Sequence, residues 1–201
     1  PCHLPAEHLA FFRALCGDEN VLTDTYTRIS RSYGKGMLDA LRLRRKIIQN
    51  LPEAVIAPRS REEIVRLVAY ADEHRIPVTV FGGGSTVTRG METPLGGITV
   101  DMSRHMNRVL AFNETDQTIT VEAGISGPRL EALLNNAVRE FGAARAYTCG
   151  HFPQSFEYSS VGGWAVTRGA GQNSTYYGKI EDLVIAQDYV TPIGELRTCP
   201  Q

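Results

Sequence analysis

A glycine triplet followed by two hydroxyl residues is the part of this sequence best suited to hold an anion. It directly follows a strand-like run. Glycine lacks a Cβ, so the backbone can turn until successive N–H groups converge on a phosphate or pyrophosphate, with hydroxyl donors added. On these residues alone, a glycine-rich turn that binds nothing is an equally good interpretation. The residues concerned are Val80, Phe81, Gly82, Gly83, Gly84, Ser85 and Thr86.

Two common phosphate-binding motifs do not fit this segment. A P-loop needs a Lys next to its last glycine, and no Lys lies between Gly82 and Gly90. The dinucleotide fingerprint GxGxxG needs a glycine where Val87 stands, followed by a helix, whereas residues 88–94 have the composition of a loop. The sequence therefore argues against both a nucleotide-hydrolysing P-loop and a Rossmann site.

A second, longer polar region spans residues 147–179, which are rich in Gly, Ser and Thr and show little periodicity. We expect a loop here, and so long a loop in a compact chain is usually functional. Its hydroxyls, its glycines and the Arg168 guanidinium again offer donors to a phosphate. A flat dinucleotide spreads its polar groups over a long molecule, so three separated donor-rich segments suit it better than a single phosphate would. Trp164, the one tryptophan, is best interpreted as a core aromatic residue.

A strand–helix–strand pattern precedes and positions the glycine triplet. Residues 54–57 read as a short buried strand, and Ser60 with Glu63 predicts a capping box at the start of a helix. Pro77 ends that helix, and residues 78–81 form the next strand, also expected to be buried. This βαβ unit predicts a parallel strand pair. The buried stripe of the helix comprises Ile64, Leu67, Val68 and Ala71.

The remaining elements follow from shorter patterns. Helices are expected over residues 5–16 and 37–49, the basic run of the second being a solvated face. Strands are expected over residues 97–101, 108–112, 118–122 and 182–190, with a hairpin turn at 113–117 and a short return at 195–197. A further helix opens near Ser126. Its expected buried residues are Leu130, Leu133, Leu134, Ala137 and Val138.

Composition excludes several classes of partner. The 201 residues carry 21 Lys+Arg and 22 Asp+Glu, which does not indicate a nucleic-acid or anionic-membrane partner. No apolar run approaches the length of a transmembrane span, and the first residues do not resemble a signal peptide. The four cysteines form no CxxC pair, so we expect reduced thiols, no metal site and a cytoplasmic location.

Several longer strings resemble one family of flavoproteins. They are Gly82–Thr86, Glu122–Ile125, Gly150–His151, Ser155–Trp164, Thr167–Gly171 and Tyr177–Val184. In this order they resemble the FAD domain of the alkyldihydroxyacetonephosphate synthases, which belong to the vanillyl-alcohol-oxidase-type flavoproteins. The likeness covers roughly residues 30–198 and begins near Tyr33-Gly34-Lys35. Residues 158–164 and 177–184 are much more specific than the glycine triplet.

The resemblance implies an α+β, two-lobed FAD-binding fold of the PCMH type. After an N-terminal helical extension (residues 1–51), a small βαβ lobe would span about 52–112 and a larger mixed-sheet lobe with flanking helices about 113–201. FAD would lie between the lobes without a covalent link, with its adenine end beside residues 182–190. We expect the chain to lack the last glycine-rich flavin segment and the C-terminal substrate domain.

The resemblance also implies roles for individual residues. The segment Val80–Thr86 would wrap the pyrophosphate, and Ser159 and Ser160 would lie near the flavin ring. The family often has an acidic residue where Gln154 stands. The other residues expected to contact FAD are Gln154, Ser155, Tyr158, Gly163, Thr167, Arg168, Gly169 and Ala170.

The implied activity is the exchange of the acyl group of acyl-dihydroxyacetone phosphate for a long-chain alcohol, a step of ether lipid synthesis that would be peroxisomal in a eukaryote. His151 is the candidate acid or base, since an imidazole titrates near neutral pH; a histidine hydrogen-bonded to its own loop is the alternative. The same fold serves FAD-dependent 2-hydroxy-acid oxidases and dehydrogenases. A nucleotide-binding module without activity is a third interpretation, and a homodimer is compatible with all three.

Overall fold

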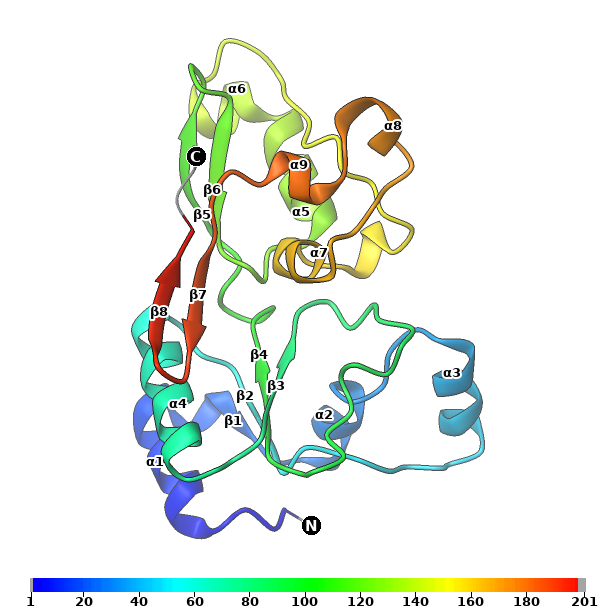
Figure 1. The fold of residues 1–201 in the computed structure, drawn as a ribbon, viewed down its shortest axis with the longest axis vertical. Coiled ribbons are helices and arrows are strands. Elements are labelled where there is room, and N and C mark those ends of the chain that lie inside the picture. The colour runs from blue at the N-terminus through cyan, green and yellow to red at the C-terminus, as the bar shows by residue number, and fades with distance from the viewer. Residues whose placement is uncertain (1, 199–201) are drawn as a thin grey trace.

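The computed structural model describes residues 2–198 and arranges them around two hydrophobic clusters. The first cluster holds a four-stranded sheet against two helices, and the second holds a hairpin against several short helices (Figure 1). Fully buried members of the first include Phe12, Ile56 and Leu67. The second is centred on Ile125, Leu130 and Trp164. Helices and sheets are thus mixed along the whole chain.

The sheet contains β1 (Val21–Leu22), β2 (Ala54–Ile56), β4 (Ile98–Asp101) and β3 (Val78–Phe81), in that order across the sheet. Strands β2 and β3 are both parallel to β4, which lies between them. The expected βαβ unit is present, but its two strands do not pair directly. Strand β1 pairs antiparallel with β2, so residues before 51 contribute to the same sheet.

Helix α4 (Arg61–Glu73) connects β2 to β3 and buries Leu67 and Ala71, as its stripe predicts. The Ser60 hydroxyl caps it by accepting from the Glu63 N–H at 3.3 Å. The Glu63 carboxylate accepts from the Arg59 N–H instead of the Ser60 N–H, so only half of the predicted capping box forms. Helix α1 (Ala6–Cys16) packs on the same cluster through Phe12 and Leu15. The other N-terminal elements are η1 (Asp18–Asn20), α2 (Thr25–Ser30) and α3 (Met37–Arg44).

Strand β3 is exposed, contrary to the expectation of a buried strand. Val78 and Val80 are 38% and 62% exposed, and only Phe81 is buried. The reason is the strand order, which places β3 at the edge of the sheet.

Strands β5 (Val109–Asn113) and β6 (Thr118–Val121) form the predicted hairpin. Helix α5 (Gly127–Asn135) follows, capped by the Ser126 hydroxyl. The chain then starts a separate helix, α6 (Ala137–Phe141), which breaks the helical phase. Val138 is therefore 56% exposed, and its predicted burial is wrong.

The predicted long loop at 147–179 is partly helical. It contains η2 (Phe156–Tyr158), α7 (Val161–Thr167) and α8 (Ser174–Tyr177). Helix α9 (Ile180–Leu183) then occupies the start of the predicted strand 182–190, because the Asp182 carboxylate accepts from the Lys179 N–H and initiates a helical turn. The strand itself, β7 (Asp188–Thr191), begins later and pairs with β8 (Gly194–Arg197).

The mixed sheet expected in the second half is found in the first half. From residue 109 onward the strands of the described chain form only two-stranded hairpins, β5–β6 and β7–β8. The β7–β8 hairpin returns to the first half and lies along α4 (Figure 1). Arg61 of α4 forms ion pairs there with Asp188, at 2.7 Å, and with Glu195.

Candidate functional site

The segment after β3 keeps its backbone donors free. Within residues 2–198, the N–H groups of Gly83, Gly84, Ser85 and Thr86 donate to no oxygen, and these residues are half-buried. Gly84 has a φ of +67°, a conformation that favours glycine. Unpartnered N–H groups in a half-buried turn have the chemistry that an anion requires.

The second polar region packs directly on this segment. A Cβ at Gly83 would lie 1.8 Å from the carbonyl oxygen of Tyr158, and a Cβ at Gly82 would lie 2.2 Å from the Ser160 hydroxyl. Only glycine allows so close an approach of two backbones. The structure therefore brings two of the three donor-rich segments together, although they are more than 70 residues apart in sequence.

The serines expected near a flavin ring are buried and already have protein partners. Ser160 caps α7 by accepting from the Gly163 N–H at 3.3 Å. The Ser159 hydroxyl accepts from the indole N–H of Trp164 at 2.6 Å. Trp164 is 4% exposed, which confirms its interpretation as a core residue. These bonds fix the turn that faces Gly82 and Gly83.

His151 is 1% exposed, and neither of its ring nitrogens has a hydrogen-bond partner within the described chain. The alternative in which the imidazole is hydrogen-bonded to its loop is therefore wrong. The ring meets Trp164 edge-on, with 4.9 Å between centroids. Burial lowers the pKa of His151 below its ordinary value, because the charged form loses hydration. An unpaired buried imidazole is costly, and His151 is one of the few buried side chains of residues 2–198 with polar atoms that lack a partner.

The third donor-rich segment is less open than expected. The Arg168 guanidinium forms an ion pair with Glu181 at 2.5 Å, so a phosphate would compete with that carboxylate. The Thr167 hydroxyl donates to the Gly163 carbonyl at 2.7 Å. Gly169 lies near His151, since a Cβ there would be 3.5 Å from Nε2. Ala170 and Gln154 are exposed, and Ser155 is half-buried.

An N-terminal segment, Tyr33–Lys35, completes the surroundings of the glycine triplet. The Lys35 N–H donates to the Thr86 carbonyl at 2.9 Å, and a Cβ at Gly34 would lie 2.1 Å from that same oxygen. The Asp39 carboxylate accepts from the Gly34 N–H at 3.1 Å. Sequence reasoning assigned no functional role to this segment, although the family likeness begins there.

A buried ionic network anchors this N-terminal segment to the far end of the glycine-rich loop. Glu92 accepts hydrogen bonds from Arg89 at 2.5 and 2.7 Å, from Asn50 at 2.7 Å and from Arg42. These bonds, chiefly those from Arg89, lower the pKa of Glu92 to about 2 against the opposing effect of burial. The loop between β3 and β4 is thus held at both of its ends.

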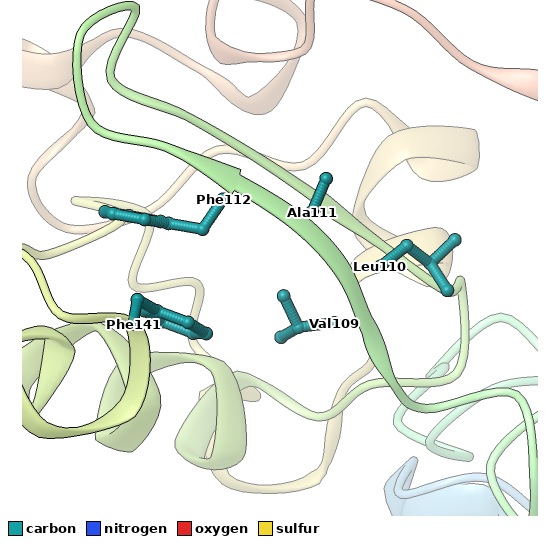
Figure 2. A pocket seen from close by; sticks show the side chains of 5 residues that line it. All are labelled: Val109, Leu110, Ala111, Phe112 and Phe141. Atoms are coloured by element: carbon teal, nitrogen blue, oxygen red, sulfur yellow. The ribbon is translucent and has the colours of Figure 1, made fainter.

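A shallow apolar hollow beside β5 is not the candidate site. Figure 2 shows it lined by Val109, Leu110, Ala111, Phe112 and Phe141, with the rings of Phe112 and Phe141 facing each other. None of these side chains can bind a phosphate or donate a hydrogen bond.

Comparison with known proteins gives the family. A model described as the FAD binding domain matches residues 52–200.

The chain belongs to the FAD binding domain family.

FAD is accordingly its cofactor. Three features of the structure are compatible with a bound dinucleotide: the free N–H groups of residues 83–86, the glycine-lined contact with residues 158–160 and the unpartnered His151 ring. Among residues 2–198, no helix is both long and apolar enough to cross a bilayer.

The relatives of this FAD binding domain include alkyldihydroxyacetonephosphate synthases and a dehydrogenase. It is 35% identical to the alkyldihydroxyacetonephosphate synthase of Trypanosoma brucei brucei over 92% of the chain and 30% of that protein. It is 33% identical to that of Dictyostelium discoideum, over 96% of the chain and 31% of that protein. A mitochondrial D-lactate dehydrogenase (cytochrome) of Arabidopsis thaliana is 33% identical over 73% of the chain and 24% of that protein. The chain thus spans less than a third of the length of these relatives.

Solved structures agree with this assignment. An alkyldihydroxyacetonephosphate synthase superposes with a TM-score of 0.90 at 32% identity, over 98% of this chain and 39% of that one. A p-cresol methylhydroxylase with bound substrate superposes with a TM-score of 0.74 at 19% identity, over 96% and 35%. The second likeness shows the fold alone. The mixed helical and sheet structure is therefore the fold that these two enzymes share.

Proposed function

We propose that this FAD binding domain serves an enzyme that, like the alkyldihydroxyacetonephosphate synthases it resembles, exchanges the acyl group of acyl-dihydroxyacetone phosphate for a long-chain alcohol. One observation carries the proposal. The family model begins at residue 52, whereas the likeness to the synthases extends over 92–96% of the chain and so includes most of the residues before it.

Several of those earlier residues contact the proposed cofactor loop or its far end. Gly34 and Lys35 contact Thr86, and Asn50 and Arg42 bind Glu92. The likeness to the D-lactate dehydrogenase covers a smaller share of the chain. The sequence likeness to the synthases extends into this N-terminal region, and this favours their activity over a general FAD role.

We assign the cofactor contacts as follows. The segment Val80–Thr86 binds the pyrophosphate through its free N–H groups, and residues 154–160, Gly163 and 167–170 bind the remainder of FAD without a covalent link. The two hydrophobic clusters correspond to two lobes, with the cofactor at the contact between Gly82–Gly83 and Tyr158–Ser160. The bound cofactor supplies the electrophilic and redox chemistry of the reaction.

His151 holds or transfers a proton at a ring nitrogen in this proposal. Burial keeps its imidazole neutral at neutral pH, so one nitrogen can accept a proton while the other carries one. Neither nitrogen is engaged by the described chain, which leaves both for cofactor or substrate. A homodimer, and a cytoplasmic or (in a eukaryote) peroxisomal location, accompany the proposal.

The alternative is an FAD-dependent oxidation of a 2-hydroxy acid. Relatives with names of that kind include a glycolate oxidase subunit of Bacillus subtilis, at 30% identity over 74% of the chain, and a D-2-hydroxyglutarate dehydrogenase of Escherichia coli, at 35% over 75%. Both match the chain less extensively than the synthases do.

The purified full-length protein distinguishes the two activities. It should incorporate a labelled long-chain alcohol into acyl-dihydroxyacetone phosphate and release the fatty acid, while the flavin absorbance at about 450 nm persists when D-lactate or D-2-hydroxyglutarate is added without oxygen. Bleaching by a hydroxy acid together with no alcohol incorporation would reject the synthase proposal in favour of the alternative. A protein that carries no flavin and takes up none would contradict both.

A further inference from the structure

Lys35 lies where the two cofactor-binding segments meet. Its backbone N–H is bonded to Thr86, the last residue of the glycine-rich segment, at 2.9 Å. Its ammonium lies over the ring of Tyr158, with 5.0 Å from Nζ to the ring centroid. The Tyr158 carbonyl in turn packs against Gly83. One residue thus contacts both segments.

The ammonium of Lys35 has no carboxylate partner within residues 2–198, whereas three other cations of this region each have one. Arg31 is paired with Asp101 at 2.7 Å. Arg42 and Arg89 are both paired with Glu92. Asp39, the acidic group nearest in sequence, is 1% exposed and engaged by Gly34 and Arg42, so it does not neutralise Lys35 by direct contact.

A positive charge beside the glycine-rich segment would strengthen its hold on a pyrophosphate, and the segment itself has none. Residues 80–86 contain neutral donors only. Neutral N–H groups orient a phosphate, but a cation at hydrogen-bond distance adds a charge-assisted bond that is roughly twice as strong. A flexible lysine stem can also move its ammonium from the Tyr158 ring to a ligand, because an exposed cation–π contact is weak, about 0.5–1 kcal/mol.

We infer that Lys35 is a ligand of the FAD pyrophosphate, acting from the N-terminal segment together with the free N–H groups of Gly83–Thr86. The inference rests on the proposed placement of the pyrophosphate at this segment. The Asp39 bond to the Gly34 N–H and the Lys35 bond to Thr86 hold the lysine backbone beside the loop before any ligand arrives.

The test is the affinity of the apo protein for FAD and for ADP, measured by calorimetry or flavin fluorescence over a range of NaCl concentrations. Lys35→Gln should weaken both ligands about tenfold at low salt, and its affinity should depend less on salt than that of the wild type. Lys35→Arg should retain most of the affinity. Arg44→Gln removes an exposed basic residue from α3 and should leave the affinities for FAD and ADP unchanged. Unchanged thermal unfolding would show that the variants are folded.

Wild-type affinity for FAD in Lys35→Gln would overturn the inference. So would a loss of affinity with an unaltered salt dependence, since that result would indicate a structural role. If FAD and ADP bind normally and only the KM for the phosphate-bearing substrate of the full-length enzyme rises, Lys35 serves the substrate and the inference is wrong. Failure of the wild-type protein itself to bind ADP or FAD would instead contradict the placement of the pyrophosphate.

Discussion

Replacing Glu92 with glutamine should destabilise this protein substantially, although the side chains have almost the same size. Glu92 is 8% exposed and accepts hydrogen bonds from Arg89, Asn50 and Arg42. The amide retains one acceptor but carries no charge, which leaves Arg42, itself 6% exposed, without its strongest partner. Removing one member of a buried ion pair is costly because the other charge stays buried.

The pKa of Glu92 gives the magnitude. Lowering it from its ordinary 4.5 to about 2 corresponds to about 3 kcal/mol in favour of the ionised form. We therefore expect Glu92→Gln to reduce the free energy of unfolding at pH 7 by about 2–3 kcal/mol. This is a large part of the stability of a typical domain.

The pH dependence follows from the same shift. The ionised form is favoured in the folded protein, so its contribution is complete above pH 4.5 and is lost as the pH falls towards 2. The difference between wild type and Glu92→Gln should shrink over that interval, because protonated Glu92 is neutral as well.

Urea unfolding followed by circular dichroism between pH 3 and 7 measures both effects. Glu181→Gln is the matched control, since its carboxylate pairs with Arg168 at the surface and its replacement should change stability much less. A loss below about 1 kcal/mol for Glu92→Gln at pH 7, or a difference that does not depend on pH, would refute the reasoning.

Three further predictions concern the glycine-rich contact and its surroundings. Gly83→Ala should lower the free energy of unfolding by about 3 kcal/mol even without FAD, because its Cβ would lie 1.8 Å from a backbone oxygen. Gly90→Ala is the control and should be nearly neutral, because the nearest atom to its Cβ lies at 3.9 Å. Equal losses for the two variants in urea unfolding would contradict this prediction. Trp164→Phe and Ser159→Ala should show a coupling of about 1 kcal/mol in a double-mutant cycle, and simple additivity would deny the hydrogen bond between them. The His151 ring should titrate below its ordinary pKa in NMR, because burial disfavours its charged form. The free energy of unfolding should therefore fall as the pH drops below about 6.5, and His151→Phe should remove that fall. A ring that titrates at or above 6.5 would show that burial does not govern the pKa of His151.

The Gly83 contact also changes how a substitution there is interpreted. The sequence indicates that a side chain at Gly83 would block a pyrophosphate. In the structure the same side chain meets the protein backbone first. Loss of FAD from a Gly83 variant would therefore not locate the pyrophosphate, and Lys35→Gln is the more specific probe.

The sequence by itself determined the elements whose signals are local. The Ser60 cap, the stripe of Leu67 and Ala71 and the turn at 113–117 each depend on residues a few positions apart, and all three are present. Local signals failed where glycines and hydroxyls are dense. Helix α7 is capped by Ser160, but its two glycines conceal the helical period. The resemblance of the longer strings to flavoproteins was confirmed by the family match.

Only the tertiary structure decided which distant segments meet. It placed β4 between β2 and β3 and so exposed Val80 at a sheet edge. It also packed Gly83 on Tyr158 and brought Lys35 to Thr86. Such contacts depend on how closely two backbones approach and on which donors and acceptors are brought together in space. They form between residues tens of positions apart in sequence, and periodicity and capping carry no information over that distance.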